Sequence, residues 1–208
     1  MNPAILAYVK LPGQLPAAIA AQLRAAVPYG RRMRLAQGAP GIASLLGMAL
    51  ARVLLGEVQG KHPSALTLEF PYGKKPFSPG GADFSLSHSG AWLAAIACAS
   101  ARVGLDIEAA MPLNSTGDTV PRKLVDWTAR EATVKACGAT LGEIHDVQVG
   151  ATHCCYGQER WTLARPEVPA GLISAVVSER ALTLTVRTVR WESLITCTDA
   201  RDAEVACA

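Results

Sequence analysis

The sequence has few charged residues, no paired-cysteine motif and no long apolar run, and each absence excludes a class of protein. Charged residues make up 18% of the 208-residue chain and apolar residues 50%, a balance that excludes intrinsic disorder. A formal net charge of only +3 argues against a protein that coats nucleic acid through charge alone. The 18 glycines and 13 prolines are ordinary numbers for this length, so a fibrous chain is excluded as well.

The start of the chain and its apolar segments give no sign of targeting or of a membrane span. Met1–Lys10 lacks a basic stretch followed by a long apolar core, so it does not have the pattern of a signal peptide. The longest clearly apolar run, Ala91–Ala99, is far shorter than the ~20 residues that a membrane span needs. We therefore expect a cytoplasmic protein that does not enter the membrane.

The six cysteines do not form a standard metal or redox motif. None belongs to a C-x-x-C pair, and the adjacent Cys154 and Cys155 suit neither an ordinary disulfide nor a zinc knuckle. His145 and His153 lie near them in the sequence, so a zinc-dependent or thiol enzyme built on these residues stays open as an alternative. Buried thiols in a cytosolic protein are the favoured interpretation.

The spacing of apolar residues predicts helices and strands in an order typical of α+β proteins. Helices are expected over Leu15–Val27, Ser44–Leu55 and Thr128–Cys137. Strands are expected over Pro3–Val9, Leu66–Phe70, Phe84–Leu86, Trp92–Cys98, Arg102–Glu108, Val147–Thr152, Leu172–Val177 and Leu182–Val189. We expect a turn at Ser87–Ala91 and a hairpin between the last two strands. Because the late strands follow one another with short connections, the order favours an α+β fold over a parallel doubly wound sheet.

The stretch R-V-G-L-D-I-E at 102–108 predicts two carboxylates on one face of a strand. Alternate strand residues point the same way, so Asp106 and Glu108 project together while Val103, Leu105 and Ile107 face the core. Two carboxylates about 7 Å apart repel each other unless a positive group lies between them, and Mg²⁺ prefers carboxylate oxygens. The D-x-E pattern alone is compatible with a cation site and with a solvated strand face.

The stretch W-T-A-R-E-A-T-V-K at 127–135 places Glu131 and Lys135 on one face of a helix. Thr128 and Glu131 have the spacing of a capping box, and Glu131 precedes Lys135 in the favourable order for an ion pair, so helix stability alone explains these residues. The functional interpretation is a third carboxylate and a cation at the start of a helix, where phosphate also binds.

Two further stretches carry weaker signals. In F-S-L-S-H-S-G at 84–90, His88 lies in a serine-rich turn, and the chain has no G-x-S-x-G elbow of an α/β-type Ser-His-Asp hydrolase. G-E-V-Q-G-K at 56–61 is one residue short of a P-loop, and His62 follows its lysine where Ser or Thr is required. We therefore exclude both a hydrolase of that type and a P-loop.

Taken in order, the motifs F-x-L-S-H-S-G, G-L-D-I-E and W-T-x-[KR]-E-A-x-x-K resemble the 4′-phosphopantetheinyl transferases of the Sfp type. The resemblance covers a core from about Tyr72 to Leu141. It implies transfer of phosphopantetheine from coenzyme A to a serine of an apo acyl or peptidyl carrier protein, with release of 3′,5′-ADP. It also implies a monomer of two similar α+β halves, residues 1–100 and 101–208, related by a pseudo-two-fold axis with the coenzyme between them.

The resemblance further implies roles for individual residues. Asp106, Glu108 and Glu131 would hold Mg²⁺ against the pyrophosphate of coenzyme A. Glu131 would be the base for the carrier serine, and Lys135 would neutralise or protonate the leaving phosphate. Contacts to coenzyme A are expected from the basic segment with Arg31, Arg32 and Arg34, from Lys74 or Lys75, and from Ser87, His88 and Lys135.

The sequence departs from the family pattern at several positions. Ser85 stands where the family usually has Asn, and Ala43 and Ser44 stand where a basic residue is usual. The segment between Glu108 and Trp127 is short, and much of the family's helical segment is missing from it. A non-catalytic module that binds coenzyme A or a carrier protein is therefore the alternative.

The charge is divided unevenly along the chain. Residues 1–100 contain nine lysines and arginines against three acidic residues, a net charge of +6, and residues 101–208 carry −3. The expected phosphate contacts other than Lys135 lie in the basic half, and the expected metal ligands lie in the acidic half. This division suits a polyanionic coenzyme held between two halves of opposite charge.

Overall fold

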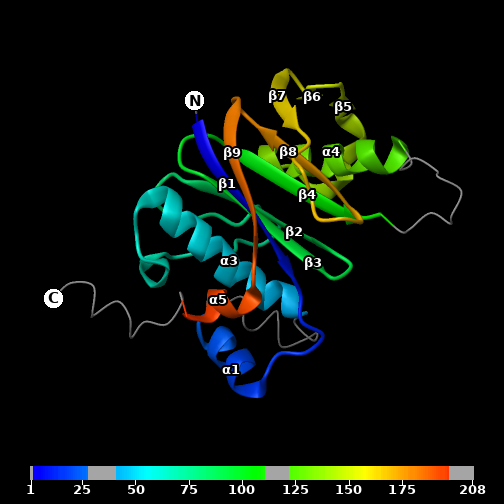
Figure 1. The fold of residues 1–208 in the computed structure, drawn as a ribbon. Coiled ribbons are helices and arrows are strands. Elements are labelled where there is room, and N and C mark those ends of the chain that lie inside the picture. The colour runs from blue at the N-terminus through cyan, green and yellow to red at the C-terminus, as the bar shows by residue number, and fades with distance from the viewer. Residues whose placement is uncertain (1, 28–40, 111–121, 197–208) are drawn as a thin grey trace, which may run out of the picture.

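Two β-sheets, each covered by a long helix, make up the architecture (Figure 1). It is seen in a computed structural model, which describes residues 2–27, 41–110 and 122–196. Arg31, Arg32 and Arg34, which are expected to contact coenzyme A, lie outside the described residues.

The first sheet contains the N-terminal strand and carries helices on one face. Its order is β2–β3–β1–β9, formed by Asp83–Ser89, Trp92–Cys98, Asn2–Lys10 and Leu182–Val189. Strand β1 is antiparallel to β3 and parallel to β9, so Leu6 lies between Ile96 and Val186. Helix α3 (Ile42–Gln59) packs on this sheet and also contacts α1 (Ala17–Ala25) and α5 (Trp191–Thr196).

The second sheet is antiparallel throughout and packs against helix α4 (Arg122–Cys137). Its order is β4–β8–β7–β6–β5, formed by Val103–Ala109, Leu172–Ser178, Glu159–Ala164, His153–Tyr156 and Gln148–Val149. Two short 3₁₀ helices, η1 (Pro63–Ala65) and η2 (Leu141–Asp146), lie in the connections. Strand β4 is an edge strand of this sheet, as β2 is of the first.

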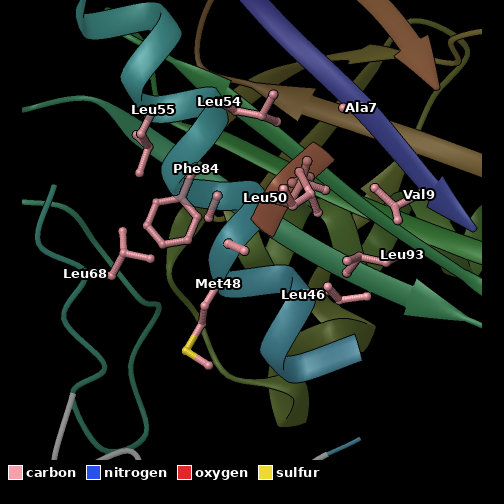
Figure 2. Packing of buried hydrophobic residues seen from close by; sticks show 14 of the residues in the cluster. Ala7, Val9, Leu46, Met48, Leu50, Leu54, Leu55, Leu68, Phe84 and Leu93 are labelled. Carbon is pink, nitrogen blue, oxygen red and sulfur yellow. The ribbon is translucent and has the colours of Figure 1, made fainter. Parts of the chain in front are cut away.

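Three apolar clusters hold these layers together. Figure 2 shows the first, in which Leu46, Leu50 and Leu54 of α3 pack with Phe84 and Leu93 of the sheet. The second lies between the two sheets and the third between α4 and the second sheet. Burying one such side chain contributes about 1.5–3 kcal/mol, so the three clusters determine how the layers stack.

Helix α3 is apolar on nearly all sides because it lies inside the protein. Gly60 follows its last residue and adopts the left-handed conformation (φ 64°), and the Lys61 N–H donates to the Gly56 carbonyl at 2.9 Å, which closes the end of the helix. Of the helices that the structure describes, α3 alone is long and apolar enough to cross a membrane, but most of it is buried in the core. This burial is consistent with the core helix of a soluble protein.

The α+β class is confirmed, but the predicted hairpin between Leu172–Val177 and Leu182–Val189 is wrong. Both sides of β8 are already paired, with β4 and β7, so β9 crosses to the first sheet and pairs with β1. As a result β9 and α5, from the second half of the chain, contact elements of the first half. The division into 1–100 and 101–208 stays a prediction.

Three other sequence predictions also differ from the structure. Leu66–Phe70 is not a strand, and only an isolated bridge joins Glu69 to Phe77. Within Val147–Thr152 only β5 forms, whereas β6 and β7 were not expected. Strand β2 continues to Ser89 through the expected turn, because its polar side chains have partners on β4.

Candidate functional site

The edges of the two sheets meet at β2 and β4, where side-chain oxygens of β2 accept hydrogen bonds from backbone amides of β4. The donors and acceptors are Val103 to Asp83 (2.7 Å), Leu105 to Ser85 (3.0 Å), Ile107 to Ser87 (3.3 Å) and Ala109 to Ser89 (3.0 Å). We refer to these four bonds as the β2–β4 ladder. Each rung lies two residues beyond the last on both strands, because alternate residues of a strand share a face.

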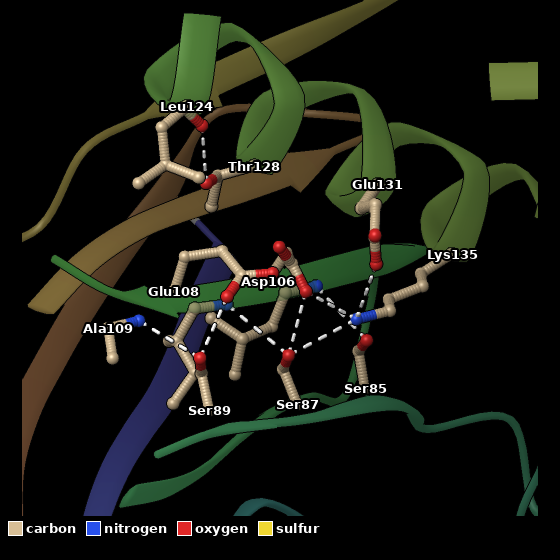
Figure 3. Close-up of polar contacts among 12 residues, drawn as sticks. Ser85, Ser87, Ser89, Asp106, Glu108, Ala109, Leu124, Thr128, Glu131 and Lys135 are labelled. Atoms are coloured by element: carbon tan, nitrogen blue, oxygen red, sulfur yellow. Dashed lines mark hydrogen bonds and ion pairs between the residues drawn. The ribbon is translucent and has the colours of Figure 1, made fainter. Parts of the chain in front are cut away.

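Gly104 and Asp106, which alternate along β4 with the core residues, lie under helix α4. Gly104 permits the close approach, since a Cβ atom at this position would lie only 1.9 Å from the Ala132 carbonyl oxygen. Two residues along, Asp106 lies beneath Glu131 and Lys135 of α4, as Figure 3 shows. The strand alternation predicted for 103–108 is confirmed, with Leu105 and Ile107 in the core between the sheets.

Asp106, Glu108 and Glu131 come together as a carboxylate triad. One carboxylate oxygen from each lies within 4.8 Å of the others, and this is the one group of three or more potential metal ligands found within the described residues. An octahedral Mg²⁺ with ligands at 2.0–2.1 Å places its ligand oxygens about 2.9–4.2 Å apart, so the spacing needs little adjustment. The triad could therefore hold a hard divalent cation.

The two oxygens of Asp106 have different surroundings, although only 2% of the residue is exposed. Oδ1 accepts hydrogen bonds from the Ser87 hydroxyl at 2.7 Å and from Lys135 Nζ at 2.6 Å (Figure 3). Oδ2 is buried and has no hydrogen-bond partner among the described residues. A buried polar atom without a partner is costly, so this oxygen suits a cation ligand.

The Ser87 hydroxyl is fully occupied by groups of the protein. It donates to Asp106 and accepts from the Ile107 amide and from Lys135 Nζ at 3.2 Å. A hydroxyl has one proton and two lone pairs, so no hydrogen-bonding capacity remains. The expected contact of Ser87 with the coenzyme would require one of these three bonds to break.

The expected ion pair on α4 is confirmed, but the capping box is wrong. Lys135 Nζ lies 3.7 Å from Glu131 Oε2. Helix α4 already includes Arg122, so Thr128 lies in its interior and its hydroxyl donates to the Leu124 carbonyl at 2.8 Å. Glu131 is therefore not at the start of a helix, and capping does not explain its place in the triad.

Two cavities are linked to the triad through its hydrogen-bond and ion-pair partners, since Lys135 lines the larger and Ser87 the smaller, although no triad carboxylate lines either. The larger, about 460 Å³, is lined by Lys74, Lys75, Leu86, Val134, Lys135 and Leu141, among others. The smaller, about 210 Å³, is lined by His88 and by Ala43 and Ser44 in the first turn of α3. Pro76 and Leu86 line both cavities, so the two adjoin.

The two adjacent lysines have different environments. Lys75 Nζ donates to Asp83 Oδ2 and to the Val103 carbonyl at 2.7 Å, which ties it to the first rung of the ladder. Burial lowers the pKa of Lys75, and the Asp83 carboxylate opposes that shift. Lys74 is exposed at the larger cavity, and its ammonium forms no ion pair with any part of the chain that the structure describes.

The alternative site at Cys154 and Cys155 receives no support. These cysteines and the nearby His145 and His153 are all described, yet they form no group of metal ligands. Cys154 is buried in the core beneath α4, and burial raises the pKa of its thiol, which disfavours the reactive thiolate.

Sequence reasoning missed three rungs of the ladder, at Asp83, Ser85 and Ser89. Their signal is the pattern D-x-S-x-S-x-S at 83–89, in which polar residues alternate over a whole strand. Because a turn was predicted at Ser87–Ala91, the pattern was divided between a short strand and that turn, and the alternation over the whole strand was missed. Ser89 also donates to Glu108 Oε2 at 2.7 Å, so it contacts a member of the triad.

No protein-family model matches the chain, and no curated protein matches it in sequence.

The protonation of Asp106 gives a test of its surroundings without bound metal. Burial raises the pKa of Asp106 to about 6, while Lys135 and Ser87 lower it and Glu131 raises it further. Because the folded-state pKa lies above the unfolded value near 4, this carboxyl contributes less stability as the pH rises through about 6.

Asp106→Asn removes this titration. Between pH 4 and 7 the free energy of unfolding of the variant should therefore rise relative to that of the wild type. The expected change in the difference is about 3 kcal/mol, from roughly two pKa units. Urea unfolding of both proteins with a metal chelator measures it. A difference that stays constant over this pH range would contradict the buried environment.

Proposed function

We propose that this chain is a 4′-phosphopantetheinyl transferase that uses coenzyme A and Mg²⁺ to convert apo acyl or peptidyl carrier proteins to their holo forms. The observation that carries the proposal is the carboxylate triad, in which Asp106 has a buried oxygen without a partner and is paired with Lys135, a residue that lines the larger cavity. The order of the motifs along the sequence supports the same activity.

The groups around the two cavities suit the parts of coenzyme A. His88 and the first turn of α3 line the smaller cavity. Because no side chain caps the N-terminus of α3 at Gly41, the backbone N–H groups of that turn can bind an anionic phosphate. The exposed Lys74 supplies a positive charge at the larger cavity, whose lining is mainly apolar and suits the pantetheine arm. Lys135 lies between this cavity and the triad, where the pyrophosphate would bind.

Bound Mg²⁺ would neutralise charge on the pyrophosphate oxygens, and Asp106, Glu108 and Glu131 would hold it. In the transfer, the carrier serine oxygen bonds to the phosphorus of the phosphopantetheine arm, and the bond from that phosphorus to the bridging oxygen breaks. Glu131, directly or through a water, accepts the serine proton. Lys135 stabilises the charge that develops on the leaving 3′,5′-ADP, consistent with the dominance of electrostatics in phosphoryl transfer.

The proposal includes the finer features that follow from the family resemblance. These are two halves related by a pseudo-two-fold axis, a monomeric chain and a place in the cytoplasm. The helix-covered sheets on either side of the shared core are compatible with two similar halves.

The direct test is a mass measurement of carrier proteins. Incubation with coenzyme A and Mg²⁺ should add one phosphopantetheine arm to an apo carrier from fatty-acid, polyketide or nonribosomal-peptide synthesis. Glu131→Gln should slow transfer at least about 100-fold, because it removes a metal ligand and the base together.

Glu179→Gln is the matched control, because this exposed carboxylate pairs with Arg102 at the far end of β4. It should transfer at the wild-type rate. If the wild type modifies none of the carriers, the transferase proposal fails, and coenzyme A binding without transfer would instead favour the non-catalytic module.

The two lysines should separate coenzyme binding from stability. Lys74→Ala should weaken coenzyme A binding about tenfold, the effect of losing one charge-assisted contact, and leave stability nearly unchanged. Lys75→Ala leaves the part-buried Asp83 without its ion-pair partner and should cost about 1–3 kcal/mol of unfolding free energy. Calorimetry measures the coenzyme A affinity and urea unfolding measures the stability. Weaker coenzyme A binding by Lys75→Ala with unchanged binding by Lys74→Ala would contradict the assignment and indicate that Lys75 contacts the coenzyme.

A further inference from the structure

Ser89 makes hydrogen bonds to two adjacent residues of β4, one in the β2–β4 ladder and one in the carboxylate triad. Its hydroxyl accepts the Ala109 amide in the last rung of the β2–β4 ladder. The same hydroxyl donates its proton to Glu108 Oε2 at 2.7 Å (Figure 3). Since a serine hydroxyl has one proton, its donor is committed to a carboxylate of the triad.

The other serines of the ladder show that these two contacts are separable. Ser85 accepts the Leu105 amide at 3.0 Å, the same distance as for Ser89 and Ala109, but it does not touch the triad. Ser87 holds Asp106 Oδ1 from the same face of β2. Neighbouring ladder residues thus orient the two β4 carboxylates, and Ser85 contributes a backbone bond alone.

We propose that Ser89 is a positioning residue that orients Glu108 as a cation ligand. The inference rests on the cation site of the proposed function, and two independent features support that site: the clustering of the carboxylates and the unpartnered, buried Oδ2 of Asp106. Hydrogen bonds to ligating carboxylates restrict their rotation, and their loss typically weakens metal affinity 10- to 100-fold. Because the Ser89 hydroxyl donates to Oε2, Oε1 of Glu108 is the oxygen that does not bind Ser89 and can turn toward the cation.

The test measures Mn²⁺ binding to the full chain without coenzyme A, by the electron paramagnetic resonance signal of free Mn²⁺. Mn²⁺ is a suitable probe because it shares the preference of Mg²⁺ for carboxylate oxygens. Ser89→Ala should weaken Mn²⁺ binding roughly tenfold or more, and Ser89→Thr, which keeps the hydroxyl, should restore it. Ser85→Ala is the matched control, which loses a ladder rung and some thermal stability but keeps the wild-type Mn²⁺ affinity.

Equal weakening by Ser85→Ala and Ser89→Ala would overturn the inference, because it would reduce Ser89 to a structural rung. Unchanged affinity in Ser89→Ala, or no Mn²⁺ binding by the wild type, would overturn it too. The carrier mass assay on the same proteins separates the two proposals. If the variants show the expected Mn²⁺ pattern but the wild type transfers nothing, the positioning role stands and the transferase proposal falls.

Discussion

The hydrogen bonds of one edge strand are the constraint on which the candidate site depends. Strand β4 has β8 on one side, and the amides of its other side need acceptors that no neighbouring strand backbone provides. Asp83 and three serines of β2 supply those acceptors at a spacing of two residues. The same four bonds join the facing edges of the two sheets.

This arrangement concentrates negative charge where the protein can hold it only with positive partners. Asp106 is nearly fully buried, yet a single lysine, Lys135, reaches both it and Glu131. Lys135 pairs with two of the three carboxylates, so the cluster has an excess of negative charge, and burial disfavours that negative charge further. A divalent cation would bring the summed charge of the three carboxylates and the lysine to zero, and this charge argument underlies the proposed cation site.

Local patterns in the sequence predicted the features that depend on one element at a time. Strand alternation gave the shared face of Asp106 and Glu108, and helical spacing gave the pair of Glu131 and Lys135. Features that depend on contacts between distant segments were not predictable. Strand β9 left the expected hairpin because both sides of β8 were taken, and Lys75 differs from its neighbour because it reaches a carboxylate on β2.

The central claim, that side chains of β2 satisfy the outward amides of β4, is tested most directly by amide hydrogen exchange followed by NMR. The amides of Leu105, Ile107 and Ala109 should exchange slowly, like those of interior strands, and Ser85→Ala should accelerate exchange at Leu105 more than at Ala109. Rapid exchange at all three amides in the wild type, as on an open sheet edge, would contradict the account.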